Sequence, residues 1–326
     1  MALVQLNTVI KRTAYSSLAV FLTYIATYVP LLFHLGYGYN LHVASTIIFA
    51  VLSVLITLGL YGGGSDGFEG VDRVKVVFSV LVGLVLMEEL LLNSAFAMYG
   101  LALSISGLVL LPILAVWLGR GNRWLRVALE TVALIFATRV VLSPFPLGFL
   151  NLPAFLPTIY TLILVALVLY LTYHGFSAKK VRVSTGRYGL ELQLGVGLGI
   201  GTLIGFVEYF VLRPQPILVG VGFVQMLAYI LIVPTVMVGV VEELLFRGLL
   251  QGSLEKIVPT WQAIGVASIL FGLMHVGWMN PLEVLLAYGA GVVCGCLAVM
   301  TDSLIMPITV HSFGNFVLYI IALHPI

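Results

Sequence analysis

Three ionisable residues lie close together inside one of the most apolar stretches of the chain: Glu242, Glu243 and Arg247. A charge at membrane depth costs several kcal/mol, so such residues are expected to pair with one another or to act on something. Glu243 and Arg247 are four residues apart with the acid first, which is the favourable order for an ion pair on one helix face. Glu242 is turned about 100° away from Glu243. It is therefore the acid that this pairing leaves over, and the first candidate for chemistry.

Two later stretches place further polar groups inside apolar runs. His275 follows Phe271 by four residues, well inside a predicted span, and Asn315 follows His311 by four, which puts His311 and Asn315 on one face of the final helix. At about 1.5 Å per residue, Glu242, His275 and His311 come out roughly 15, 22 and 10 Å from the cytoplasmic ends of their helices. These depths allow the three side chains to meet in one layer. We therefore expect one polar site built from all three stretches.

A second group of charges at membrane depth consists of Glu88, Glu89 and Arg139. A carboxylate–guanidinium pair between two helices would reduce the cost of burying all three, so we interpret this group as structural. A functional role, such as a proton relay, stays open. The residues around Glu88 resemble those around Glu242, but no histidines follow at matching distances. We interpret this likeness as a coincidence in a leucine-rich sequence.

The composition sets the class of protein. Hydrophobic residues make up 61% of the 326 residues, charged residues only 9%, and the mean hydropathy is +1.16. Soluble domains carry roughly 25% charged residues, so the chain is predicted to be an integral membrane protein in contact with the lipid bilayer. A net charge of +2 without a basic patch argues against a nucleic-acid partner. The two cysteines, Cys294 and Cys296, lie in an apolar run and are interpreted as small buried hydrophobic residues.

Apolar runs long enough to cross a hydrocarbon core, which takes about 20 helical residues, predict an all-α polytopic transmembrane helix bundle of about eleven helices. The predicted spans are 13–33, 41–60, 74–99, 101–119, 124–142, 155–173, 188–212, 217–252, 260–279, 281–300 and 304–323. Glycines at two- and four-residue spacing in the seventh span favour close helix packing: Gly195, Gly197, Gly199, Gly201 and Gly205.

The connecting segments predict the orientation and a division of the chain. One face would collect nearly all of the Lys and Arg residues and the other only Arg213, so the positive-inside rule places the N-terminus in the cytoplasm. The longest polar and basic segment, 174–189, separates a predicted N-terminal accessory membrane region of about six helices, 1–187, from a C-terminal membrane core, 188–326, which carries the three polar stretches.

The three polar motifs resemble those of a known family. Glu-Glu-x-x-x-Arg, Phe-x-x-x-His and His-x-x-x-Asn occur in this order at 242–247, 271–275 and 311–315. This arrangement resembles the CAAX protease and bacteriocin-processing family of intramembrane proteases, which includes the Ras-converting-enzyme type of CAAX prenyl endopeptidase. The resemblance covers roughly 189–326. It implies an endopeptidase that cleaves a prenylated or otherwise membrane-embedded peptide substrate.

The resemblance also implies roles for the residues that match the motifs. Glu242 and His275 would hold and activate a water molecule, while His311 and Asn315 would donate hydrogen bonds to the tetrahedral oxyanion. Glu243 and Arg247 would support the site. Phe246 or Phe271 would either contact a lipid tail or simply pack.

Other mechanisms and functions are weighed beside this one. Glu and His also bind Zn²⁺, but the sequence contains no His-Glu-x-x-His, so we expect no cofactor and keep a Zn²⁺-dependent version as the less favoured alternative. A catalytically inactive membrane scaffold of the same family and a proton-coupled transporter also stay open. The expected location is the plasma membrane of a prokaryote or the endoplasmic reticulum of a eukaryote.

Overall fold

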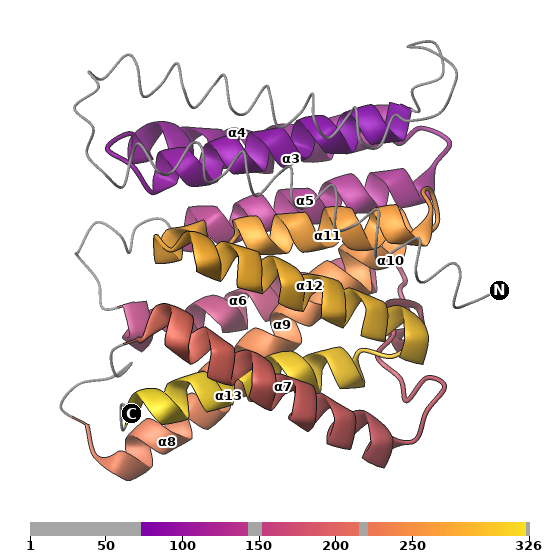
Figure 1. Cartoon of the computed structure of the whole chain (residues 1–326). Helices are drawn as coiled ribbons and strands as arrows, with labels where there is room; N and C mark the ends of the chain where they lie inside the picture. Colours follow the sequence, from indigo (N-terminus) through magenta and orange to yellow (C-terminus); the bar gives the residue numbers. More distant parts are fainter. Residues whose placement is uncertain (1–72, 143–151, 215–220, 324–326) are drawn as a thin grey trace.

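The computed structural model describes residues 73–142, 152–214 and 221–323, and every regular element in these ranges is helical. The prediction of an all-α helix bundle is confirmed. Figure 1 shows α3 and α4 along one edge of the bundle and α7, α8 and α13 at the opposite edge, with α5, α11 and α12 between them. The elements are α3 (Arg73–Leu92), α4 (Ala97–Leu118), α5 (Arg123–Leu142), α6 (Leu152–Tyr173), η3 (Ala178–Val181), α7 (Leu190–Leu212), α8 (Phe223–Ile230), η4 (Leu231–Val238), α9 (Gly239–Glu243), η5 (Leu244–Gln251), α10 (Gly252–Leu254), α11 (Thr260–Leu273), η6 (Val276–Trp278), α12 (Pro281–Thr301) and α13 (Ile305–Leu323).

Seven helices in the described ranges are long and apolar enough to cross a membrane, as expected of an integral membrane protein. Each predicted span from 74–99 onward coincides with a described helix or series of helices, whereas the spans 13–33 and 41–60 lie outside the described residues. The helices α3 and α5 are not among the seven, because each carries four charged residues. The count of eleven spans and the cytoplasmic N-terminus stay predictions.

The segments α8 to α10 form one 32-residue rod, from Phe223 to Leu254, and this rod carries Glu242 and Glu243. Two stretches of it, η4 and η5, are wound as π-helix on either side of α9. Pro234 lies in η4 and has no backbone N–H to donate. The Thr235 hydroxyl donates instead to the carbonyl of Ile230, at 2.8 Å. π-Helical turns are rare in proteins, and those that occur inside α-helices are often found at functional sites. The two turns therefore indicate that α9, which lies between them, belongs to a functional site.

The helix that carries His311 and Asn315 is placed by close packing against α7. Three buried glycines lie one turn apart on the α7 face toward α13: Gly197, Gly201 and Gly205. A Cβ atom at Gly201 would lie 2.6 Å from the carbonyl oxygen of Val310 in α13. The remaining two predicted glycines, at 195 and 199, meet nothing within 4 Å. Close packing is therefore confirmed for one glycine face of the helix.

One apolar core joins helices from both sides of the predicted division at 187. Val85 of α3 and Phe136 of α5 belong to the same buried cluster as Phe246 of η5 and Leu270 of α11. Because lipid tails are as apolar as leucine, such contacts stabilise a membrane protein through tight packing rather than through removal from water. The position of the boundary stays a prediction, but the described N-terminal helices pack directly on the helices that carry the motifs.

Candidate active site

The ion pair expected from the spacing of Glu243 and Arg247 is present. Arg247 Nη1 donates to Glu243 Oε1 at 2.8 Å, and both side chains are buried. The guanidinium also lies over the ring of Phe271, 4.4 Å from its centroid. This cation–π contact stabilises a positive charge that is buried away from water. In α12, Gly291 provides the space, since a Cβ there would lie 3.1 Å from Arg247 Nη2. The ion pair, which lies on the continuous helix 223–254, is thus packed against α11 through Phe271 and against α12 at Gly291.

Glu243 has a second partner that the spacing did not predict. His311 Nδ1 lies 2.9 Å from Glu243 Oε1, the same oxygen that accepts from Arg247. Because an ionised carboxylate only accepts hydrogen bonds, Nδ1 carries the proton. A chain of polar contacts therefore runs from Arg247 in η5 through Glu243 in α9 to His311 in α13. The Nε2 atom of His311 takes no part in this chain.

That Nε2 atom lies 3.8 Å from Glu242 Oε2. The distance is too long for a direct hydrogen bond and short enough for one water molecule to bond both atoms. Glu242 keeps 20% of its side chain exposed and His311 keeps 12%, whereas Glu243 is fully buried. The two neighbouring glutamates thus have different surroundings, and Glu242 is the accessible one.

The other oxygen of Glu242 accepts a hydrogen bond from the Tyr160 hydroxyl, at 2.6 Å. Tyr160 lies in α6, which belongs to the predicted accessory region. No local pattern indicates this contact, because Tyr160 is one of 15 tyrosines and precedes Glu242 by 82 residues. A side chain from the N-terminal helices therefore fixes the orientation of the candidate base.

His275 lies just beyond the end of α11, where the chain turns into η6. Its Nδ1 atom is 3.0 Å from the carbonyl oxygen of Phe271. Since a carbonyl only accepts, Nδ1 donates and Nε2 is left as an acceptor. The Phe271 ring packs against both site histidines, with centroids 4.9 Å from His275 and 5.6 Å from His311.

Asn315 lies one turn beyond His311 on the same face of α13, and its Nδ2 atom donates to the carbonyl of Pro234 at 2.8 Å. This bond joins α13 to the π-helical η4. It uses one of the two amide hydrogens and leaves the second available. Phe246 and Phe271 are both almost completely buried and pack edge to face, with ring centroids 5.2 Å apart.

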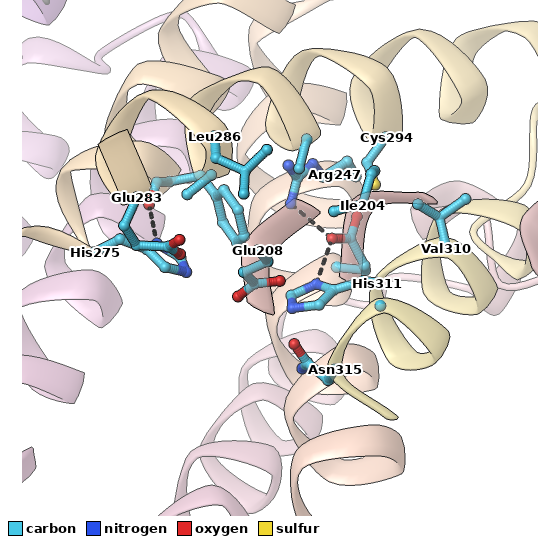
Figure 2. A pocket seen from close by; sticks show the side chains of 15 residues that line it. Ile204, Glu208, Arg247, His275, Glu283, Leu286, Cys294, Val310, His311 and Asn315 are labelled. Carbon is cyan, nitrogen blue, oxygen red and sulfur yellow. Dashed lines mark hydrogen bonds and ion pairs between the residues drawn. The ribbon is translucent and has the colours of Figure 1, made fainter. Parts of the chain in front are cut away.

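These side chains surround one cavity of about 450 Å³, a volume that includes its opening. Figure 2 shows His275 and Glu283 on one side of it, Arg247 and His311 on the other, and Glu208 between the two histidines. Of the residues expected at the site, the following line the cavity: Glu243, Arg247, Phe271, His275, His311 and Asn315. Glu242 is not among the lining residues, but its Oε2 atom lies 3.8 Å from Nε2 of His311, which is one of them. The structure thus brings the three motifs together.

Sequence reasoning missed two acidic residues of this cavity, Glu208 of α7 and Glu283 of α12. Both lie in apolar runs of the sequence, and a lone charge in a predicted span is the signal that could have found them. Cys294, interpreted above as a small buried residue, is buried and lines the same cavity. Among the residues that the structure describes, no three His, Cys, Asp or Glu side chains are grouped so as to hold a metal ion.

The second group of charges also reaches the site. The ion pair predicted within this group is present: Arg139 of α5 donates to the carboxylate of Glu89 and in addition to the carbonyl of Met274, the residue before His275. Glu88 accepts instead from the hydroxyl of Ser104 in α4. The Glu89–Arg139 pair is therefore a structural link between α3, α5 and the turn that carries His275.

Comparison with known proteins agrees with this geometry. No curated protein and no solved structure matches the chain. Residues 224–317 match the model of one family, described as type II CAAX prenyl endopeptidase Rce1-like. The matched range begins in α8, ends in α13 and contains all three motifs. The resemblance inferred from those motifs is thereby confirmed: the part of the chain that carries all three motifs is similar to the Rce1-like type II CAAX prenyl endopeptidases.

Proposed function

We propose that this protein is an intramembrane endopeptidase of the CAAX prenyl protease type, which hydrolyses a peptide bond of a lipid-modified or membrane-embedded substrate. One observation carries the proposal. Glu242, the accessible acid of the pair, stands 3.8 Å from His311 Nε2 at the edge of a cavity that also contains His275 and Asn315. These residues come from all three motif segments within the Rce1-like range.

In the first step, Glu242 takes a proton from a water molecule, and the resulting hydroxide forms a C–O bond to the scissile carbonyl carbon. Tyr160 holds one carboxylate oxygen, so the other is the oxygen that accepts this proton. His275 supports the step as an acceptor, because its Nδ1–H is used by the Phe271 carbonyl and its Nε2 has a free lone pair. General-base catalysis of this kind contributes about 10²–10⁴-fold to a rate.

The tetrahedral intermediate carries a negative oxygen, and two groups of α13 are suited to stabilise it. Asn315 has one amide hydrogen left after its bond to Pro234. His311 has Nδ1 occupied by Glu243, so Nε2 is the atom that donates when the ring is in its imidazolium form. Donors set in advance toward developing charge supply the largest part of many enzymes' rate enhancement. The C–N bond then breaks, and Glu242 returns its proton to the leaving amine.

The test uses the purified full-length protein in detergent and two peptides of one sequence, one farnesylated and one unmodified. We expect cleavage of the farnesylated peptide and its loss in Glu242→Ala. The control is Glu191→Ala, since Glu191 is exposed at the start of α7 and outside the cavity. Full activity of Glu242→Ala would overturn the mechanism. Cleavage of both peptides at equal rates would keep the endopeptidase and remove the requirement for prenylation.

A chelator distinguishes the two versions of the water-activating step. In the proposed mechanism the protein's own carboxylate and histidines activate the water, and cleavage continues unchanged after treatment with a strong chelator. Loss of activity with the chelator, followed by recovery on addition of Zn²⁺, would replace this mechanism by the metal-dependent one.

A further inference from the structure

Glu208 and Glu283 are the two acidic residues of the cavity that the proposed mechanism does not use. Glu208 is partly buried in α7, and Glu283 is 1% exposed in the first turn of α12. Within the described ranges, no Lys, Arg or His forms an ion pair with either carboxylate. A buried carboxylate without a partner is costly, so its retention in the wall of a cavity calls for a reason.

The ordinary explanation for Glu283 does not account for its side chain. A glutamate at the third position of a helix often reaches back to the backbone N–H of the N-cap residue. The N-cap of α12 is Asn280, which accepts from Leu282 N at 3.0 Å. Among the described residues the Asn280 N–H donates no such bond to the Glu283 carboxylate, and Glu283 Oε2 is buried with no hydrogen-bond partner. The carboxylate is therefore directed toward the cavity rather than toward the helix end.

The positions of the two acids are fixed by their helices. Asn280 Nδ2 donates to the carbonyl of Val211 at 2.9 Å, which links the start of α12 to the end of α7. Glu208 lies one turn before this link and Glu283 one turn after it. Both side chains line the cavity, and Figure 2 shows Glu283 beside His275 and Glu208 between His275 and His311. They form a prepared acidic wall that faces the candidate catalytic residues.

We propose that Glu208 and Glu283 form a subsite for a cationic side chain of the substrate, a lysine or arginine close to the scissile bond. This inference rests on the proposed function. An ammonium or guanidinium group would supply the hydrogen-bond donors that Glu283 Oε2 lacks and would offset the charge of the pair. A metal ion is the other occupant that two carboxylates attract, but the described His, Cys, Asp and Glu side chains include no three-ligand group of suitable arrangement.

The experiment compares farnesylated peptides that differ in one side chain. Lysine is placed in turn at each position within two residues of the cleaved bond other than the farnesylated cysteine, and each peptide is paired with one that carries norleucine there, which has a similar stem and no charge. We expect the ratio of kcat/KM for lysine over norleucine to reach about tenfold at one position, as one charge-assisted contact would give. In Glu283→Gln this ratio should fall toward one, and in Glu208→Gln it should fall in part.

The readout is the ratio, so a change in the overall rate of a variant does not affect it. Glu191→Gln, on the same helix as Glu208 but exposed and outside the cavity, is the matched control and should keep the wild-type ratio. The proposal is overturned if wild type prefers lysine at none of the positions, or if the preference persists in the Glu208→Gln/Glu283→Gln double variant. Thermal unfolding in detergent identifies a variant that fails to fold.

A binding measurement separates this proposal from the proposed function. Fluorescein-labelled lysine and norleucine peptides are titrated with the Glu242→Gln variant, and binding is followed by fluorescence anisotropy. Tighter binding of the lysine peptide that is lost on adding Glu283→Gln supports the subsite even if wild type cleaves neither peptide. Cleavage without any charge preference keeps the endopeptidase and rejects the subsite. Zn²⁺ or Ca²⁺ binding that depends on Glu283, with equal affinity for both peptides, also rejects it.

Discussion

Glu88-Glu89 of α3 and Glu242-Glu243 of α9 are two pairs of adjacent glutamates in apolar stretches of the chain, and each pair has one arginine. In both pairs the second glutamate takes the arginine. Glu89 accepts from Arg139 of another helix, and Glu243 accepts from Arg247 of its own continuous rod. In both pairs the first glutamate accepts from a hydroxyl, of Ser104 in one case and of Tyr160 in the other. The polar partners alone therefore do not distinguish the pairs.

The difference lies in access and in what stands opposite. Glu88 and Ser104 are both fully buried, whereas Glu242 keeps 20% of its side chain exposed and faces His311 beside a cavity. A general base needs an accessible oxygen and a neighbour that holds the water, and geometry comes before any other requirement. The comparison teaches that a Glu-Glu pair in an apolar helix marks a buried polar cluster, and that the histidines and the cavity mark the candidate for chemistry.

The largest expected effect comes from removing the same charge at the two first glutamates. Glu242→Gln should lower the rate of peptide cleavage by about 10²–10⁴-fold, the usual contribution of a general base. Glu88→Gln should leave the rate within a few-fold of wild type, because its carboxylate lies outside the cavity and contacts Ser104. Initial rates on the farnesylated peptide measure both.

Thermal unfolding of both glutamine variants accompanies these rates, so that a loss of fold is not taken for a loss of catalysis. Equal losses of activity in two folded variants would contradict this expectation, because Glu88 and its neighbours Ser104, Glu89 and Arg139 would then be needed for the reaction as well.

The next effect concerns the two arginines. Arg247→Met leaves Glu243 without its ion-pair partner in a buried place, and breaking a buried pair costs about 3–5 kcal/mol. Removing both partners is often neutral, so Glu243→Gln/Arg247→Met should recover stability. It should not recover activity, because His311 loses the carboxylate that orients it. Glu89→Gln/Arg139→Met should recover stability and keep most activity.

Denaturation in detergent micelles and cleavage rates on the same preparations check this pattern. Recovery of full activity by Glu243→Gln/Arg247→Met would mean that His311 is oriented without Glu243. Loss of activity in the folded Glu89→Gln/Arg139→Met variant would mean that the link from Arg139 to the carbonyl before His275 is needed for the reaction.

Much of this arrangement could be predicted from the sequence because it is local. The apolar runs predict the helices, and four-residue spacing predicts the Glu243–Arg247 pair. An ion pair between Arg139 and the Glu88-Glu89 pair was also predicted, because buried charges of opposite sign at similar depth have few other ways to lower their cost, but the sequence did not indicate that Glu89 is the partner. The π-helical turns of the central rod were not predicted, since hydrophobic periodicity does not separate them from α-helix in a run that is apolar on all sides.

The contacts that complete the site come from segments far apart in the sequence, and no local pattern indicates them. Tyr160 meets Glu242 only because α6 packs beside the rod. Arg139 reaches the Met274 carbonyl only because α5 lies next to the end of α11. His311 was assigned to the oxyanion alone, and its contact with Glu243 depends on the depth of α13, which span boundaries predict only within several residues.

The hydroxyl donors of the two first glutamates, Tyr160 and Ser104, are expected to differ in their effect on catalysis. Tyr160→Phe removes a hydrogen bond to a carboxylate, an interaction worth about 1.5–3 kcal/mol. We expect a clear fall in kcat for the peptide, because Glu242 is then free to turn away from the water. Ser104→Ala removes the corresponding donor from Glu88 and should leave kcat unchanged. Steady-state kinetics distinguish the two, and an equal fall in kcat for both variants would contradict a local role of Tyr160.

The smallest expected effect tests whether the position of α13 matters to one glutamate pair and not to the other. Gly201→Ala would place a methyl group 2.6 Å from the Val310 carbonyl and push α13 away from α7, and overpacking of this kind costs about 1–3 kcal/mol. Since His311 and Asn315 lie on α13, peptide cleavage should fall. Gly199→Ala is the matched control, because a Cβ there meets nothing within 4 Å and alanine favours helix. If Gly201→Ala and Gly199→Ala cleave the peptide equally well, close packing of α13 on α7 is not what brings His311 to Glu242. The difference between Glu242 and the fully buried Glu88 would then depend only on the cavity beside Glu242.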